Sequence, residues 1–239
     1  MTTQSRDHDP MVPALVELLR GMRDSERDIF GSLDPDVRDR PMRPNDWSPK
    51  DHQAHLTAWK AIQAERIRAV AAGEELPTEQ REDDEVNAEL QAMRADWSWE
   101  AVVAEADEIG QRLEAAIRSA GAAVLQESDR LIGGIFGNGP FHAITHFGWL
   151  VDARIGVDEK RVAAFIDAQE ALLDRVALPD ADRGVGFYNL ACAHAVAGRL
   201  DRARRLLPQA FRLRGDLREF AREDPDLAAL RDELPSLGA

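Results

Sequence analysis

Three of the six histidines in this sequence are placed where their side chains could act together. His142 and His146 are four residues apart, so on a helix both imidazoles would lie on one face. His55 lies in a separate stretch, WSPKDHQAHLTAWK at residues 47–60. Imidazole nitrogen binds zinc and nickel well, and three protein ligands beside one open position are typical of a catalytic metal site. The pattern therefore predicts a divalent metal, zinc or nickel, bound by these three histidines.

The same histidines also have an ordinary structural interpretation. A histidine pair at this spacing occurs often by chance, so His142 and His146 alone are weak evidence for a metal. His52 is expected to pack on Trp47 near the start of its helix, and His194 to be either packed or exposed. Aromatic side chains near the candidate ligands are predicted to wall a pocket and to exclude water from it: Trp59, Phe141, Phe147 and Trp149.

The helix that carries His55 has a complete start signal. Ser48 is suited to cap unpaired backbone N–H groups, and Pro49 falls at the first helical position, where its missing N–H costs nothing. Asp51 stands where a capping-box acid belongs. Asp51 and Asp152 are also candidates to support a ligating imidazole. Capping explains Asp51 more simply, and a solvated helix position explains Asp152, so no catalytic acid or base is assigned.

Helical periodicity dominates the rest of the chain. Apolar residues recur with a period near 3.6 over 12–33 and 99–120, the capped helix extends to about Ala72, and a further helix carries the histidine pair to about Gly156. No segment alternates with the period of two that marks a strand. We therefore expect an all-α protein with a four-helix bundle over residues 1–157.

Residues 12–156 resemble the DinB-like four-helix bundles. The matching features are the stretch W-S-x-K-D-x-x-x-H-L-x-x-W of the second helix and the HxxxH of the fourth. The resemblance implies an up-down-down-up bundle and puts His55, His142 and His146 on the family's metal-ligand positions. It also implies metal-dependent chemistry, because such proteins include thiol-using transferases and isomerases, for example mycothiol-dependent maleylpyruvate isomerases. The segment GNGPFHAITHFGWL is similar to the subgroup that contains the colibactin self-resistance cyclopropane hydrolase.

These features lead to an expected function and two alternatives. We expect a metal-dependent enzyme that transfers a low-molecular-weight thiol to an electrophilic small molecule, or hydrolyses it, in detoxification or self-resistance. One alternative is sequestration of a small molecule without turnover. The other is a protein-interaction module in which the bundle serves only as a scaffold.

Residues 158–239 are expected to form a second, smaller helical domain. After a helix over 159–177, residues 186–213 resemble one tetratricopeptide (TPR) repeat with Gly198 at its turn. A single repeat cannot bury its apolar face alone, so helix 159–177 is predicted to pack on 185–197 and to dock on the bundle. The resemblance implies a protein or peptide partner, and a homodimer is a further expectation.

Composition narrows the class of partner. The net charge of −14 disfavours nucleic acid and anionic membrane surfaces. The single cysteine, Cys192, excludes an intrachain disulfide. The N-terminus lacks the pattern of a signal peptide, and no run is apolar enough to span a bilayer. We therefore expect a cytoplasmic protein whose partner is a small-molecule substrate.

Overall fold

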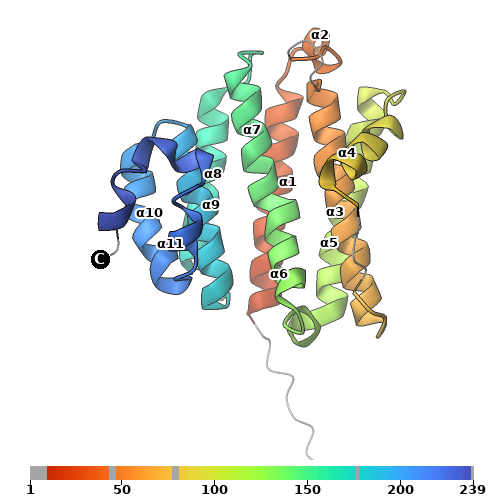
Figure 1. Cartoon of the computed structure of the whole chain (residues 1–239). Coiled ribbons are helices and arrows are strands. Elements are labelled where there is room, and N and C mark those ends of the chain that lie inside the picture. Colours follow the sequence, from red (N-terminus) through yellow and green to blue (C-terminus); the bar gives the residue numbers. More distant parts are fainter. Residues whose placement is uncertain (1–9, 43–46, 77–80, 176–177, 238–239) are drawn as a thin grey trace, which may run out of the picture.

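The computed structural model describes residues 10–42, 47–76, 81–175 and 178–237, and within these ranges it contains helices and no strand. The all-α prediction is therefore confirmed for the described part of the chain. Long helices stand side by side, and the C-terminal helices cover one flank of the bundle (Figure 1). The bundle consists of α1 (Met11–Gly31), α3 (Pro49–Ala71), α5 (Trp99–Leu125), and α6 (Asp129–Phe136) continued by α7 (His142–Asp152).

Contacts between the helix ends define the directions of the bundle helices. The ring of Trp99, which begins α5, packs on Phe30 near the end of α1, with centroids 6.3 Å apart. Helices α1 and α5 are therefore antiparallel. Lys50 near the start of α3 donates to the carbonyl of Trp97 just before α5, at 3.0 Å, so α3 and α5 begin at the same end. The fourth helix returns, which gives the expected up-down-down-up order (Figure 1).

The start of α3 forms as the sequence predicts. The Asp51 N–H donates to Ser48 Oγ at 3.2 Å, and the Ser48 N–H donates to Asp51 Oδ2 at 2.8 Å. Both halves of the capping box are thus present, with Pro49 at the first helical position. This local signal fixes where α3 begins, and therefore the height of its histidines in the bundle.

The fourth bundle helix begins earlier than the Gly139–Pro140 pair suggests. Helix α6 starts at residue 129, and a single π-helical segment, Gly137–Phe141, joins it to α7. Gly139 leaves the helical region there, with φ −105° and ψ −119°, and this irregular turn accommodates Pro140. The break changes the direction of the backbone just before His142.

The glycines of α6 allow α3 to approach closely. A Cβ on Gly134 would lie 2.3 Å from Oε1 of Gln63, a side chain that is fully buried and donates to the carbonyl of Leu131 at 2.9 Å. A Cβ on the neighbouring Gly133 would meet nothing within 4 Å. A side chain at Gly134 would therefore force the end of the Gln63 side chain to move, whereas one at Gly133 would not.

A charged pair is buried inside the bundle. Lys60 of α3 donates to both carboxylate oxygens of Glu26 of α1, at 2.7 and 2.6 Å, and both residues are at most 3% exposed. Two charges in a helical core are stable only as a pair, because each alone would carry a large desolvation cost. No local sequence pattern predicts this pair, because its two residues lie 34 positions apart.

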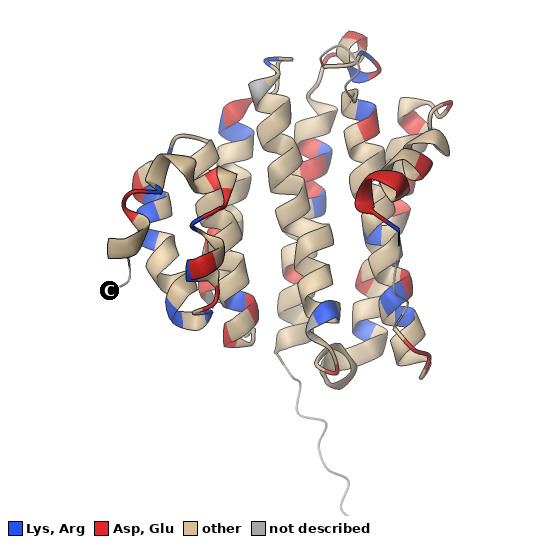
Figure 2. Cartoon of the chain, viewed as in Figure 1, with Lys and Arg blue, Asp and Glu red and all other residues tan. Residues whose placement is uncertain are grey.

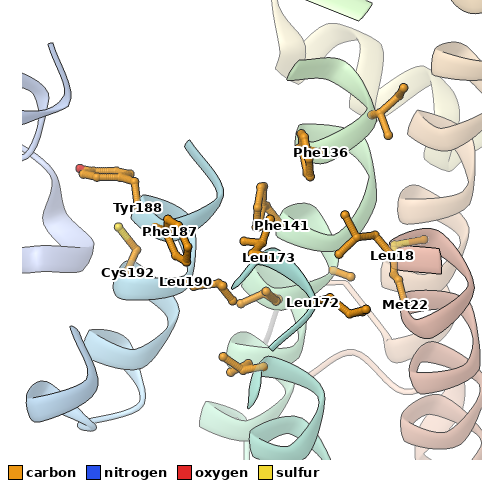
Figure 3. Packing of buried hydrophobic residues seen from close by; sticks show 14 of the residues in the cluster. Leu18, Met22, Phe136, Phe141, Leu172, Leu173, Phe187, Tyr188, Leu190 and Cys192 are labelled. Atoms are coloured by element: carbon orange, nitrogen blue, oxygen red, sulfur yellow. The ribbon is translucent and has the colours of Figure 1, made fainter. Parts of the chain in front are cut away.

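The C-terminal helices share the core of the bundle. As expected, α8 (Glu159–Arg175) packs against α9 (Asp180–Val196), and it also packs against α1. A Cβ on Gly186 of α9 would lie 2.6 Å from Leu173 and 3.3 Å from the Phe141 ring. Figure 3 shows Phe141 beside Leu173, with Phe187 farther along the same cluster. The TPR resemblance and the division between residues 157 and 158 stay predictions.

The described residues contain several further elements. They are α2 (Pro35–Arg38), α4 (Asp83–Ala92), α10 (Leu200–Leu213), α11 (Leu217–Phe220) and two 3-10 turns at Pro225–Leu230 and Leu234–Ser236. Acidic residues are prominent on α4, whereas α6 and α7 carry few charges (Figure 2). Among the described residues, no helix is both long and apolar enough to cross a membrane.

Alanine substitutions at the two neighbouring glycines test the contact between α6 and α3. Gly134→Ala is expected to lower the free energy of unfolding by about 1–3 kcal/mol, because Gln63 must move and lose its bond to Leu131. Gly133→Ala should be neutral or stabilising by up to about 1 kcal/mol, since alanine favours a helix. Urea unfolding measures both values, and equal values would contradict this account.

A double-mutant cycle tests the buried ion pair. Lys60→Met alone is expected to cost about 3–5 kcal/mol, because it leaves the Glu26 carboxylate buried without its partner. Adding Glu26→Leu should recover most of that loss. A double variant as unstable as the sum of its single variants would show that the two charges do not depend on each other.

Candidate metal centre

The three histidines predicted as ligands converge inside the bundle. His55 comes from α3, and His142 and His146 come from one face of α7. One ring nitrogen from each lies within 4.8 Å of the other two, and the Nε2 atoms of His55 and His142 are 3.0 Å apart. His55 and His146 are buried, and His142 is half-buried, so His142 is the most exposed of the three.

A fourth histidine, missed as a site residue by the sequence analysis, completes the cluster. His52 packs on Trp47 as expected, with ring centroids 5.5 Å apart. Its Nδ1 also lies 2.6 Å from Nδ1 of His146, and both residues are at most 2% exposed. The available signal was the spacing of His52 and His55, which lie three residues apart and so on neighbouring positions of one helix face.

Indole rings surround the imidazoles. Trp59 lies 6.3 Å from the His55 ring and is anchored by a 3.0 Å hydrogen bond from its Nε1 to Asn87 of α4. Trp149 contacts His146, with centroids 4.7 Å apart. Trp47, not assigned to the pocket by the sequence analysis, lies 4.6 Å from His55. Indole rings therefore cover several sides of the imidazole cluster.

The two phenylalanines predicted beside the indoles lie elsewhere. Phe147 is fully buried and packs between Phe30 and Phe165, with centroids 5.7 and 5.4 Å away. Helical geometry explains this, because Phe147 follows His146 by one residue, about 100° around α7. Phe141 stacks on Phe136 at 5.5 Å and faces the C-terminal helices. The structure thus places neither ring against the imidazoles, in contrast to the prediction from sequence.

Burial keeps the imidazoles neutral. It lowers the pKa of His55 to about 3, with the nearby His142 and His52 as further causes. Burial is the main cause that lowers the pKa of His142 to about 4, and the positive charge of Lys60 is the second cause. Burial is also the main cause that lowers the pKa of His146. Neutral imidazole is the form that binds a metal, so the lone pairs are available at neutral pH.

The donor set fits a divalent ion. Two nitrogens bound tetrahedrally to zinc at roughly 2.05 Å lie about 3.3 Å apart. The Nε2 atoms of His55 and His142 are 3.0 Å apart, which is close to this value. All three ligand nitrogens lie within 4.8 Å of one another, so small side-chain shifts would bring them to one ion. Three neutral imidazoles without a protein carboxylate suit zinc or nickel better than magnesium or calcium.

Comparison with known protein families agrees with this arrangement. The family model of the DinB superfamily matches residues 18–150, which is more than half of the 239-residue chain. The chain belongs to the DinB superfamily. No curated protein and no solved structure matches it. Metal binding is common among DinB-like proteins, and the matched region contains all three candidate ligands.

A second polar cluster lies outside the region that matches the DinB family, and arginine side chains already pair with its carboxylates. Asp167 and Glu170 of α8 lie near His194 of α9, whose Nε2 is 3.0 Å from Glu170. Arg199 reaches Asp167 at 3.3 Å, and Arg202 reaches Glu170 at 3.2 Å. The guanidinium groups balance the carboxylates, so this cluster is an ion-pair network rather than a metal site. His194 is buried, one of its two expected placements.

A third cluster contains the single cysteine. Cys192 lies 3.6 Å from Oδ2 of Asp224, which also accepts a 2.6 Å hydrogen bond from the Tyr188 hydroxyl. Burial and then the charge of Asp224 raise the pKa of the Cys192 thiol. A thiol that stays protonated is a poor nucleophile and a poor metal ligand. These contacts tie α9 to the C-terminal turns.

The lowered pKa values predict acid sensitivity of the metal-free protein. Unfolded histidine takes up a proton near pH 6.5, whereas His55 and His142 in the folded chain resist protonation down to about pH 3 and 4. Over that interval the unfolded chain binds more protons, so stability decreases as the pH falls. Each kcal/mol lost should lower Tm by about 2–4 °C.

Thermal unfolding from about pH 8 to about pH 5 measures this effect, with buffer conditions held constant. The His142→Gln variant is the control, because it should show a shallower decrease in Tm with falling pH. A variant slope equal to that of the parent protein would show that His142 does not contribute to the acid sensitivity.

Proposed function

We propose that the protein is a metal-dependent enzyme that transfers a low-molecular-weight thiol to a small electrophilic molecule or hydrolyses that molecule. The observation that carries the proposal is the convergence of His55, His142 and His146 in an enclosed, half-accessible position. Membership of the DinB superfamily supports it. Such an enzyme would remove reactive molecules, in detoxification or self-resistance.

The three imidazoles would hold a zinc or nickel ion. A bound ion of this kind supplies Lewis acidity, which increases the nucleophilicity of a thiol or a water molecule near neutral pH. The ion would not be needed for folding, because the bundle has its own extensive apolar core. His142 borders the accessible side, where a substrate or thiol would enter.

His52 is the positioning residue for His146. When His146 binds through Nε2, its Nδ1 carries a proton, and the Nδ1 of His52 lies 2.6 Å away to accept it. The Nδ1 atoms of His55 and His142 have no hydrogen-bond partner among the described residues. The only ligand whose second nitrogen is held by such a contact is thus His146, within the part of the chain that the structure describes.

Metal binding and turnover can be tested separately. Calorimetry with zinc or nickel is expected to show one ion per chain, lost in His146→Ala with little change in helical circular dichroism. His194→Gln is the matched control, because His194 lies in the ion-pair network outside the site. Loss of the fold on chelation would show that the metal is structural. Failure of the parent protein to bind either ion would contradict the proposal.

Turnover is measured by incubating the metal-loaded protein with epoxides and activated alkenes, with and without cysteine as the thiol. Mass spectrometry should detect a thiol adduct or a hydrolysed product that His146→Ala does not form. Stoichiometric retention of an unchanged molecule would favour sequestration instead.

The role of His52 gives a graded prediction. His52→Phe keeps an aromatic ring beside Trp47 but removes the acceptor for His146. Metal affinity is expected to fall about 10- to 100-fold, the usual effect of losing such a supporting contact, with stability nearly unchanged. Unaltered affinity would show that His52 acts only in packing.

A further inference from the structure

A groove separates α7 from the C-terminal helices α8 and α9. It encloses a cavity of about 340 Å³, near the lower end of the range for small-molecule sites. Most of its lining side chains are apolar, with Ile144 from α7, Val162 and Ile166 from α8, and Ala193 and Val196 from α9, although polar atoms make up nearly half of the exposed wall surface. Thr145 and Asn189 add polar groups beside the charged residues at the border, so the groove could hold a small organic molecule that has both apolar and polar parts.

The groove and the candidate metal centre are neighbours on α7. Each residue turns the helix by about 100°, so Thr145 and Trp149 lie between the groove-facing Ile144 and the cluster-facing His146. Trp149 belongs to both places: it lines the groove, and its ring is 4.7 Å from the His146 ring. It is also 49% exposed, which leaves part of the indole free to contact a ligand.

The charges around the groove indicate what kind of molecule it accepts. Glu159 and Asp226 lie on its border. The one cationic side chain among its lining residues, Arg199, is paired through Nη1 with Asp167 at 3.3 Å, and its Nε and Nη2 have no hydrogen-bond partner among the described residues. The charge of Arg199 is offset by Asp167, so Glu159 and Asp226 leave the groove with a negative balance. This balance disfavours an anionic ligand and does not repel a neutral or cationic apolar molecule.

We propose that this groove binds the substrate, a small and mainly apolar molecule without negative charge, and holds it against Trp149 beside the three imidazoles. The identification of the bound molecule as the substrate rests on the proposed function, whereas binding in the groove does not require the metal. The C-terminal helices then have a direct role, because α8 and α9 supply two of the three walls.

The test uses the full-length, metal-free protein and two fluorescent probes. N-phenyl-1-naphthylamine is apolar and uncharged, and 8-anilino-1-naphthalenesulfonate is a similar molecule with a negative charge. The uncharged probe is expected to bind at least about tenfold more tightly, because the anion is repelled by Glu159 and Asp226. Equal or tighter binding of the anionic probe would overturn the assigned ligand class.

Two tryptophan substitutions on α8 locate the bound probe. Ala163 lines the groove, whereas Ala168 is exposed on the same helix. Ala163→Trp should fill the cavity and weaken binding of the uncharged probe at least about tenfold, and Ala168→Trp should leave the affinity within about twofold. Circular dichroism and Tm confirm that both variants fold. Equal affinities in the two folded variants would overturn the groove as the binding site.

Nuclear magnetic resonance tests the link to the imidazoles. Addition of the uncharged probe should shift the Trp149 indole N–H and the His146 ring resonances, assigned with Trp149→Phe and His146→Ala. Binding without either shift would overturn the link between groove and metal centre. Probe binding in a protein that binds neither zinc nor nickel would refute the proposed function alone, and metal binding without probe binding would refute the groove alone.

Discussion

Helix α3 turns a row of polar side chains toward the interior of the bundle, and each of them requires a partner from another helix. His52 contacts His146 of α7, Lys60 pairs with Glu26 of α1, and Gln63 donates to the Leu131 carbonyl of α6. Buried polar groups are costly when unpaired, so this row constrains how the surrounding helices can pack against α3. The same constraint brings the imidazoles together and separates them from bulk water.

The neutral state of the imidazoles follows from this burial. The enclosure that lowers the pKa of His55 and His142 keeps their lone pairs free of protons. The Lys60 charge acts in the same direction on His142, although its own partner is Glu26. A cation at the imidazoles would use the same lone pairs that a proton would occupy in acid, which is why metal affinity and acid sensitivity should vary together across the histidine variants.

Helix α7 connects two parts of the molecule because its faces serve different neighbours. His142 and His146 face α3, Phe147 packs into the core between Phe30 and Phe165, and Ile144 faces α8 and α9. Trp149 lies between the imidazole face and the groove. The C-terminal helices therefore do more than cover the bundle, since they complete the walls of a groove that borders the candidate metal centre.

The sequence by itself determined the features that depend on neighbouring residues. The capping box of Ser48 and Asp51 placed the start of α3, and the four-residue spacing of His142 and His146 put both on one face of α7. Motif spacing in the DinB-like stretch also indicated His55. Only the tertiary structure decided the contacts between distant segments. His52 meets His146 across 94 residues, and Lys60 meets Glu26 across 34. Phe147 packs in the core because the helices on both sides of α7 leave space for it there. Such contacts depend on how helices are rotated and spaced in the bundle, and local periodicity does not specify either quantity.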